Sequence, residues 1–176
     1  MAIDDSLHSL ATSVGGFGGH ILGIDPGERT GWAWMHDYQL IDCGEIPTGN
    51  VPIAYNNLYQ LFTSIVNRAH IVQPIKQQPF HKQLHIAIED YRVYSWKAQD
   101  HSWSNIHTIK VVGFAELNAL AIGAPYILRL AQHAKISVTD ERLIKWGMWA
   151  RGQRHARDAI RHAGLYAIDY TNNMAR

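Results

Sequence analysis

Residues 21–27 read Ile-Leu-Gly-Ile-Asp-Pro-Gly, an apolar run that ends in a carboxylate and continues directly into a turn. Pro26 restricts Asp25 to extended backbone and cannot donate to a sheet ladder, while Gly27 permits a sharp turn. We therefore expect Asp25 at the carboxyl end of a buried strand. Because Asp-Pro-Gly is also an ordinary turn sequence, this segment alone does not establish a site.

A second apolar run that ends in acid is found at residues 85–90, which read His-Ile-Ala-Ile-Glu-Asp. Adjacent side chains of a strand point to opposite faces of the sheet, so Glu89 and Asp90 cannot both face the same site. We take Glu89 as the site residue and keep Asp90 as its alternative. Two strands that end in carboxylates favour a common acidic site more strongly than either does alone.

A third acidic segment lies in the predicted last helix, residues 154–168. His155, Asp158 and His162 are spaced by three and four residues, so they share one helix face. Small and apolar residues lie beside them and predict a face that packs closely on the sheet: Ala156, Ala159, Ile160, Ala163 and Ala167. Three arginines are expected on the opposite side, turned towards solvent or DNA: Arg154, Arg157 and Arg161.

The remaining pattern predicts one α/β domain over residues 19–176, preceded by a flexible leader at 1–18. Strands are expected at 20–25, 31–36, 38–46, 84–89 and 134–138, and helices at 53–71, 104–122 and 154–168. Thr139 or Asp140 is expected to cap a further short helix.

The predicted helix 104–122 carries an apolar stripe of Ile109, Val112, Leu117 and Leu120, with Glu116 inside it. A carboxylate on an apolar face is costly unless it is paired or reaches water. We expect Glu116 at a rim position with access to water.

The three acidic segments, in this order, resemble the RuvC family of Holliday-junction resolvases, within the RNase H-like superfamily. The resemblance covers roughly residues 19–170. The chain is most similar in kind to compact members of the family that are encoded by bacteriophages. It rests on an Asp-x-Gly and Thr-Gly pair, an Ile-Glu strand end and a His-x-x-Asp-Ala helix, here Asp25, Gly27, Thr30, Gly31, Ile88, Glu89, His155, Asp158 and Ala159. It implies an RNase H-like fold whose five-stranded mixed sheet has its first three strands antiparallel and helices on its sides.

The resemblance also implies a structure-selective endonuclease that works as a homodimer. Its expected substrates are Holliday junctions and other branched DNA such as forks and flaps. Carboxylate oxygens are the ligands that Mg²⁺ and Mn²⁺ prefer, and two such ions about 4 Å apart activate water and stabilise the leaving oxygen. Asp25, Glu89 and Asp158 are the expected ligands, with Asp25 bridging both ions. His155 is the fourth catalytic residue, either as a ligand or as an acid or base.

The formal net charge is only +1, but the basic residues are concentrated towards the carboxyl terminus. A basic surface beside an acidic site suits a phosphodiester substrate, although a solvated charged face is the alternative. The expected DNA contacts there are Arg142, Lys145, Arg151, Arg154 and Arg157. Tyr94 and Trp96 are expected to stack on unpaired bases or, alternatively, to cover the core or a dimer contact, and Lys97 is expected to contact phosphate.

Composition limits the other possibilities. The 176 residues are 47% hydrophobic without a stretch long enough to span a bilayer, which predicts a soluble, cytoplasmic protein with no membrane partner. The single Cys43 excludes an intramolecular disulfide and is expected to be a small buried residue. An RNase H-like enzyme acting on RNA or on RNA/DNA hybrids, and a non-catalytic junction-binding protein, remain open as alternatives.

Overall fold

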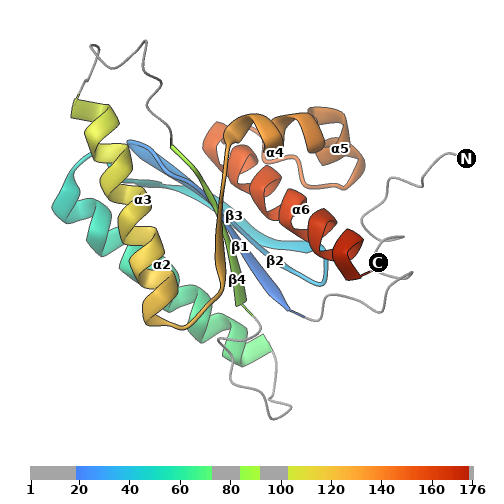
Figure 1. The fold of residues 1–176 in the computed structure, drawn as a ribbon, viewed down its shortest axis with the longest axis horizontal. Helices are drawn as coiled ribbons and strands as arrows, with labels where there is room; N and C mark the ends of the chain where they lie inside the picture. Colours follow the sequence, from blue (N-terminus) through green and yellow to red (C-terminus); the bar gives the residue numbers. More distant parts are fainter. Residues whose placement is uncertain (1–18, 73–83, 92–102, 175–176) are drawn as a thin grey trace, which may run out of the picture.

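The computed structural model describes residues 19–72, 84–91 and 103–174 (Figure 1). Three successive strands come first, helices and strands then alternate, and three helices come last. The elements are β1 (His20–Asp25), β2 (Arg29–His36), β3 (Gln39–Pro47), α2 (Val51–Val72), β4 (Leu84–Glu89), α3 (Trp103–Ala121), β5 (Tyr126–Arg129), α4 (Ala131–Ser137), α5 (Asp140–Lys145) and α6 (Arg154–Met174).

The strands form one five-stranded sheet in the order β3-β2-β1-β4-β5. β1, β2 and β3 are antiparallel neighbours, whereas β4 runs parallel to β1 and β5 parallel to β4. Helices α2 and α3 cover one face of the sheet, and α4, α5 and α6 lie on the other (Figure 1). The prediction of a five-stranded mixed sheet whose first three strands are antiparallel is therefore confirmed.

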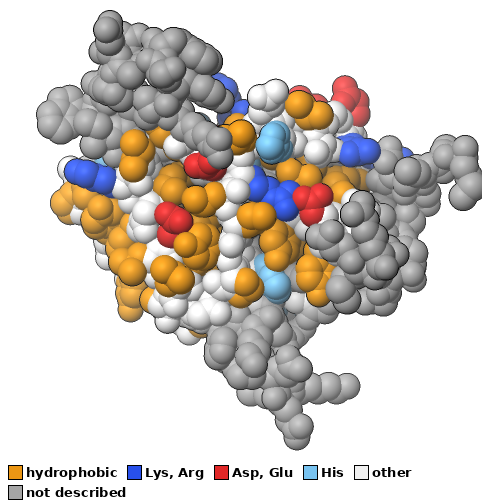
Figure 2. All heavy atoms as spheres, in the orientation of Figure 1, with side chains coloured by type: hydrophobic (Ala, Val, Ile, Leu, Met, Phe, Trp, Pro, Cys, Tyr) orange, Lys and Arg blue, Asp and Glu red, His pale blue; other side chains and the backbone are white. Residues whose placement is uncertain are grey.

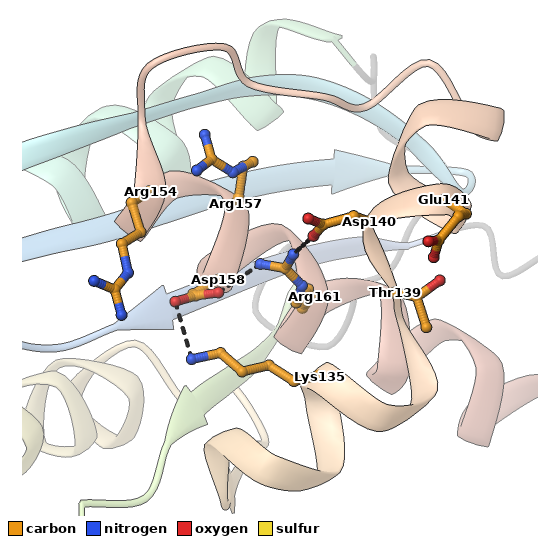
Figure 3. A pocket seen from close by; sticks show the side chains of 8 residues that line it. All are labelled: Lys135, Thr139, Asp140, Glu141, Arg154, Arg157, Asp158 and Arg161. Atoms are coloured by element: carbon orange, nitrogen blue, oxygen red, sulfur yellow. Dashed lines mark hydrogen bonds and ion pairs between the residues drawn. The ribbon is translucent and has the colours of Figure 1, made fainter.

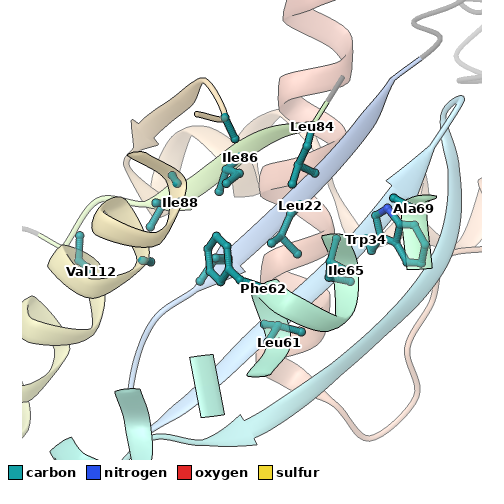
Figure 4. Close-up of a cluster of buried hydrophobic side chains, with 14 residues drawn as sticks. Leu22, Trp34, Leu61, Phe62, Ile65, Ala69, Leu84, Ile86, Ile88 and Val112 are labelled. Atoms are coloured by element: carbon teal, nitrogen blue, oxygen red, sulfur yellow. The ribbon is translucent and has the colours of Figure 1, made fainter. Parts of the chain in front are cut away.

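A separate apolar core lies on each face of the sheet. On the α2 and α3 side, alternate residues of β1 and β4, including Leu22 and Ile86, pack against Phe62 and Ile65 of α2 (Figure 4). On the opposite side, the alternate residues of β1 pack against the small residues predicted for the last helix. Since Ala156, Ala159, Ile160, Ala163 and Ala167 are all fully buried, that prediction is confirmed.

Two glycines bring α6 to backbone distance from the sheet. A Cβ built at Gly23 of β1 would overlap the carbonyl oxygen of Ala159, and one at Gly31 of β2 would overlap the carbonyl group of His155. Any side chain at these positions would push α6 away from the strands. The glycine of the apolar run and the glycine of the Thr-Gly pair therefore fix the position of α6.

The predicted fifth strand at 134–138 is wrong, because these residues lie in and just after helix α4. A strand would place Ala134, Ile136 and Val138 on one face, but Ala134 and Val138 are buried against α6 while Ile136 is 68% exposed. This short apolar run fits the two-residue repeat of a strand as well as the repeat of a helix. Packing on α6 selects the helix. The fifth strand is instead Tyr126–Arg129, which follows directly after Pro125.

The apolar stripe predicted for α3 is also wrong in part. Val112 is buried, but Ile109, Leu117 and Leu120 are 49%, 58% and 63% exposed. The buried face instead carries Val111, Val112, Ala115 and Ala119. Apolar residues occur around the whole helix, so hydrophobicity alone does not choose the face, and close packing on the sheet favours alanine.

Smaller predictions have mixed outcomes. Thr139 caps α5 by accepting a hydrogen bond from the Arg142 backbone, and Cys43 is half-buried against the α6 side of the core. Glu116 is half-buried beside Tyr126 of β5, and a hydrogen bond to it raises the pKa of Tyr126. The predicted leader at 1–18 lies outside the described residues. Within the described ranges, no helix combines the length and apolar character needed to cross a bilayer.

Candidate active site

Asp25 and Glu89 lie at the same edge of the sheet, at the carboxyl ends of two neighbouring parallel strands. The register pairs Ile24 with Ile88, so the residues that follow them are also neighbours. Leu22, Ile24 and Ile88 face the α2 and α3 core, and alternation therefore turns Asp25 and Glu89 towards α6. The same alternation directs Asp90 away from α6. It therefore favours Glu89 over Asp90 as the site residue.

Helix α6 brings a histidine to each of these carboxylates. The Nδ1 atom of His155 lies 2.8 Å from Oδ2 of Asp25, and the Nε2 atom of His162 lies 3.0 Å from Oε2 of Glu89. Both bonds link residues that are far apart in sequence. The shared helix face predicted for His155, Asp158 and His162 is thus the face that closes the site.

The electrostatics show that the three acids converge. Asp25 is 6% exposed, and burial, together with the nearby Glu89 and Asp158 carboxylates, raises its pKa to about 6 despite the opposing hydrogen bond from His155. The same hydrogen bond raises the pKa of His155. Repulsion between carboxylates and loss of water both favour the protonated form of an acid. A carboxyl group with a pKa raised in this way is typical of a functional site.

Protein cations bind Asp158. Its Oδ1 atom lies 2.5 Å from the guanidinium of Arg161, and its Oδ2 atom lies 3.2 Å from Nζ of Lys135 in α4. Arg161 also bonds Asp140 and the Val138 carbonyl and is only 8% exposed. The expectation that Arg161 faces solvent or DNA is therefore wrong, because this arginine ties α6 to the start of α5.

Glu45 is a further acidic residue at the site that the sequence pattern did not single out. Its carboxylate accepts a hydrogen bond from the backbone N–H of His155 at 2.9 Å and another from Arg29 at 3.2 Å. These contacts lower the pKa of Glu45. Glu45 thus satisfies an open backbone donor at the start of α6. The strand register places Glu45 opposite Gly31, and this pairing becomes visible only when β2 and β3 are aligned.

A basic pocket opens beside Asp158 (Figure 3). Its volume is about 470 Å³, and three arginines and a lysine from α4 and α6 surround it with the residues at the start of α5. It is lined by Lys135, Thr139, Asp140, Glu141, Arg154, Arg157, Asp158 and Arg161. The pocket has room for a phosphate-sized group next to a site carboxylate.

The residues predicted to contact DNA lie in different environments. Arg154, Lys145 and Arg151 are exposed, and Arg157 lies over the Trp149 ring and bonds the Ala150 carbonyl. Arg142 is half-buried and bonds the Ser137 carbonyl. Of these five, only Arg154 and Arg157 line the pocket. Tyr94, Trp96 and Lys97 lie outside the described residues.

The carboxylates of the site contact basic side chains of the protein. Asp25 contacts His155, and Asp158 contacts Lys135 and Arg161. Among the residues that the structure describes, no group of three or more His, Cys, Asp or Glu side chains is placed to hold a metal ion. A metal at Asp25 or Asp158 would have to replace the contacts with His155 or Lys135.

Comparison with solved structures identifies the architecture. RuvC from Thermus thermophilus in complex with a Holliday junction substrate superposes with a TM-score of 0.63 at 15% identity, over 89% of this chain and 97% of that one. The chain has the RuvC fold. A second structure of Thermus thermophilus RuvC gives a TM-score of 0.59 at 16% identity, over 88% of this chain and 97% of that one.

The likeness to RuvC extends along nearly the whole of both chains. At these identities the likeness establishes the fold. No protein-family model matches the sequence, and no curated protein matches it either. The expectation that the chain folds like RuvC is confirmed.

Proposed function

We propose that this protein is a metal-dependent endonuclease that cuts branched DNA, with Holliday junctions as its main substrate. The observation that carries the proposal is the convergence of Asp25, Glu89 and Asp158 from β1, β4 and α6, on the fold of RuvC. One of the RuvC structures that this chain resembles is a complex with a Holliday junction substrate. Fold and site thus support the same class of reaction.

The donor set fits Mg²⁺ or Mn²⁺. Hard divalent cations favour carboxylate oxygens, and burial together with the neighbouring carboxylates raises the pKa of Asp25, a shift that a bound cation would oppose. Asp25, Glu89 and Asp158 would hold two ions, and His155 would serve as a further ligand or as an acid or base. When bound, such ions supply an activated water and charge stabilisation for the leaving 3′ oxygen.

The protein groups around the acids position the site and the substrate. His155 neutralises Asp25 while its side chain stays 39% exposed, so it lies where substrate enters and is able to act as a ligand or to exchange a proton. Arg154 and Arg157 supply positive charge at the pocket next to Asp158. Together with Arg142, Lys145 and Arg151 they are proposed to contact phosphates, which gives affinity without sequence choice.

Two symmetric nicks in a four-way junction require two active sites, so we propose that the protein works as a homodimer. Apolar side chains gather over the α2 and α3 side of the molecule (Figure 2). Among the residues of α3 whose side chains are described, the large exposed hydrophobic ones are Ile109, Leu117 and Leu120. An exposed apolar patch of this kind is typical of an interaction surface, which supports α3 as the dimer contact.

Leu117→Lys is expected to convert the dimer to a monomer, because the substitution places a charge in the apolar contact. Since Leu117 is 58% exposed, the fold should not depend on it. Ile136→Lys, at a residue of α4 that is 68% exposed, is the matched control and should remain dimeric. Light scattering after size-exclusion chromatography measures both masses. A Leu117→Lys protein with the mass of the unchanged dimer would exclude this face.

The decisive test is incubation of the purified protein with an immobile four-way junction, a linear duplex and an RNA/DNA hybrid, with Mg²⁺ or with chelator. Denaturing electrophoresis should show symmetric, metal-dependent nicks confined to the junction. Cutting of the hybrid instead would reassign the enzyme to an RNase H-like activity on RNA. Binding without cutting in any metal would indicate a non-catalytic junction-binding protein.

A further inference from the structure

His162 is a buried histidine next to the candidate site to which the proposed reaction gives no role. It is 1% exposed, and its Nε2 atom lies 3.0 Å from Oε2 of Glu89. Among the described residues, its Nδ1 atom has no hydrogen-bond partner. A buried polar atom without a partner costs free energy, so an apolar side chain would suit this position better if packing were its only role.

The pairing fixes which nitrogen carries the proton. An ionised carboxylate only accepts hydrogen bonds, so the Nε2 atom of a neutral His162 must be the donor to Glu89. The bond uses Oε2, and it holds the side chain at the end of β4 in one orientation. Leu22, Ile24 and Ile88 fill the opposite face of the sheet, so the carboxylate is confined to the α6 side.

The position of His162 on α6 matches this role. It follows Asp158 by one turn and His155 by two, so the helix that supplies Asp158 also supplies a donor to each strand carboxylate. His155 and His162 differ in access to water, since their side chains are 39% and 1% exposed. The exposed histidine is placed to meet substrate, whereas the buried one can act only through Glu89.

We propose that His162 is a positioning residue that orients the Glu89 carboxylate for metal binding through its Nε2–H donor. The inference rests on the proposed function, because it assigns Glu89 to the metal site. Outer hydrogen-bond partners of ligating groups typically change metal affinity by about 10–100-fold when they are removed. His162 is therefore expected to control metal affinity more than DNA affinity.

Two amide substitutions separate this role from packing. The side-chain amide of His162→Gln can reach the position of Nε2 and donate to Glu89, whereas that of His162→Asn ends near the position of Nδ1 and cannot. Both variants bury a similar polar group, so their effects on folding are matched. We expect His162→Asn to weaken Mn²⁺ binding about tenfold or more, measured by electron paramagnetic resonance without DNA, and His162→Gln to stay within about threefold of the wild type.

Junction binding in chelator should be the same for both variants, and the Mn²⁺ concentration for half-maximal cutting should rise only for His162→Asn. Nitrogen NMR of the wild-type imidazole provides a second measurement that needs no variant at this position. It should show a protonated Nε2 and an unprotonated Nδ1. The opposite tautomer, or wild-type Mn²⁺ affinity in a folded His162→Asn protein, would overturn the positioning role.

The same experiments distinguish this failure from failure of the proposed function. If the wild type binds Mn²⁺ and cuts the junction while both His162 variants behave like it, only the role of His162 is wrong. If the wild type neither binds Mn²⁺ nor cuts any junction, the nuclease assignment fails and the role of His162 fails with it.

Discussion

Asp25→Asn is expected to abolish junction cutting, to leave junction binding intact and to make the folded protein more stable. The substitution removes the central carboxylate of the proposed metal site while keeping the size of the side chain. A bound metal ion contributes several kcal/mol to the transition state, so the rate should fall about a thousandfold or more. Glu89→Gln and Asp158→Asn should lose cutting in the same way.

The gain in stability follows from the raised pKa of Asp25. The folded state keeps the Asp25 proton up to a pKa of about 6, whereas the unfolded chain releases it near the ordinary aspartate pKa of 3.8. Stability from this group therefore falls as the pH rises between these values, and above pH 6 the ionised carboxylate costs roughly 2–3 kcal/mol. Asparagine avoids that cost, so the melting temperature of the Asp25→Asn protein at pH 8 should be about 4–12 °C higher.

The pH dependence and a control variant make this result specific. Near pH 4 the stability gain of Asp25→Asn should be much smaller, because the wild-type carboxyl is then protonated in the folded state and partly protonated in the unfolded chain. Asp42→Asn removes a carboxylate that pairs with Arg68 on the surface of β3 and should still cut. Melting curves at both pH values and gel assays measure these effects. An active Asp25→Asn enzyme would refute the assignment of this residue.

Gly31→Ala is expected to have the largest effect on folding, although it adds a single methyl group. A Cβ at this position would overlap backbone atoms of His155 and Ala156, which cannot move unless the start of α6 moves. Overpacking of this kind costs typically 1–3 kcal/mol and sometimes more, and because backbone atoms are involved we expect about 3 kcal/mol. The melting temperature should then fall by roughly 6–12 °C.

Cutting should also decrease in Gly31→Ala under conditions where the variant is folded, because α6 carries His155 and Asp158 away from Asp25. Gly49→Ala is the matched control, since a Cβ there would make only an ordinary contact, 3.6 Å from the Glu28 carbonyl oxygen. Thermal melting followed by circular dichroism gives the stability of both variants. If Gly31→Ala and Gly49→Ala melted at the same temperature, α6 could not lie at backbone distance from Gly31.

The strand acids and the last helix were predictable because their signals are local. Asp25 and Glu89 each end an apolar run, and the final residue of a strand lies at the edge of the sheet whatever the rest of the fold does. The face of α6 was predictable because small residues recur at helical spacing and leave only one side for the sheet. The geometry brings Asp25, Glu89, His155 and Asp158 together, and their catalytic roles remain proposals.

The errors occurred where tertiary contacts decide the outcome. Residues 134–138 fit a strand and a helix equally well, and contact with α6 selects the helix. Arg161 resembles a surface arginine until Asp140 and the Val138 carbonyl are placed beside it. Glu45 carries no motif, and helical spacing places His162 on the face of His155 and Asp158 without revealing its bond to Glu89, because the partners of Glu45 and His162 lie 110 and 73 residues away in the sequence.

These long separations determine when the site forms. Asp25 and His155 are 130 residues apart, so their contact closes almost the whole chain and carries a large loop-closure cost. During synthesis the amino-terminal strands emerge first, but α6 can dock only after it has itself left the ribosome, later than every strand of the sheet. A growing chain thus lacks the complete set of acids until α6 has docked, so the proposed nuclease site forms late in folding.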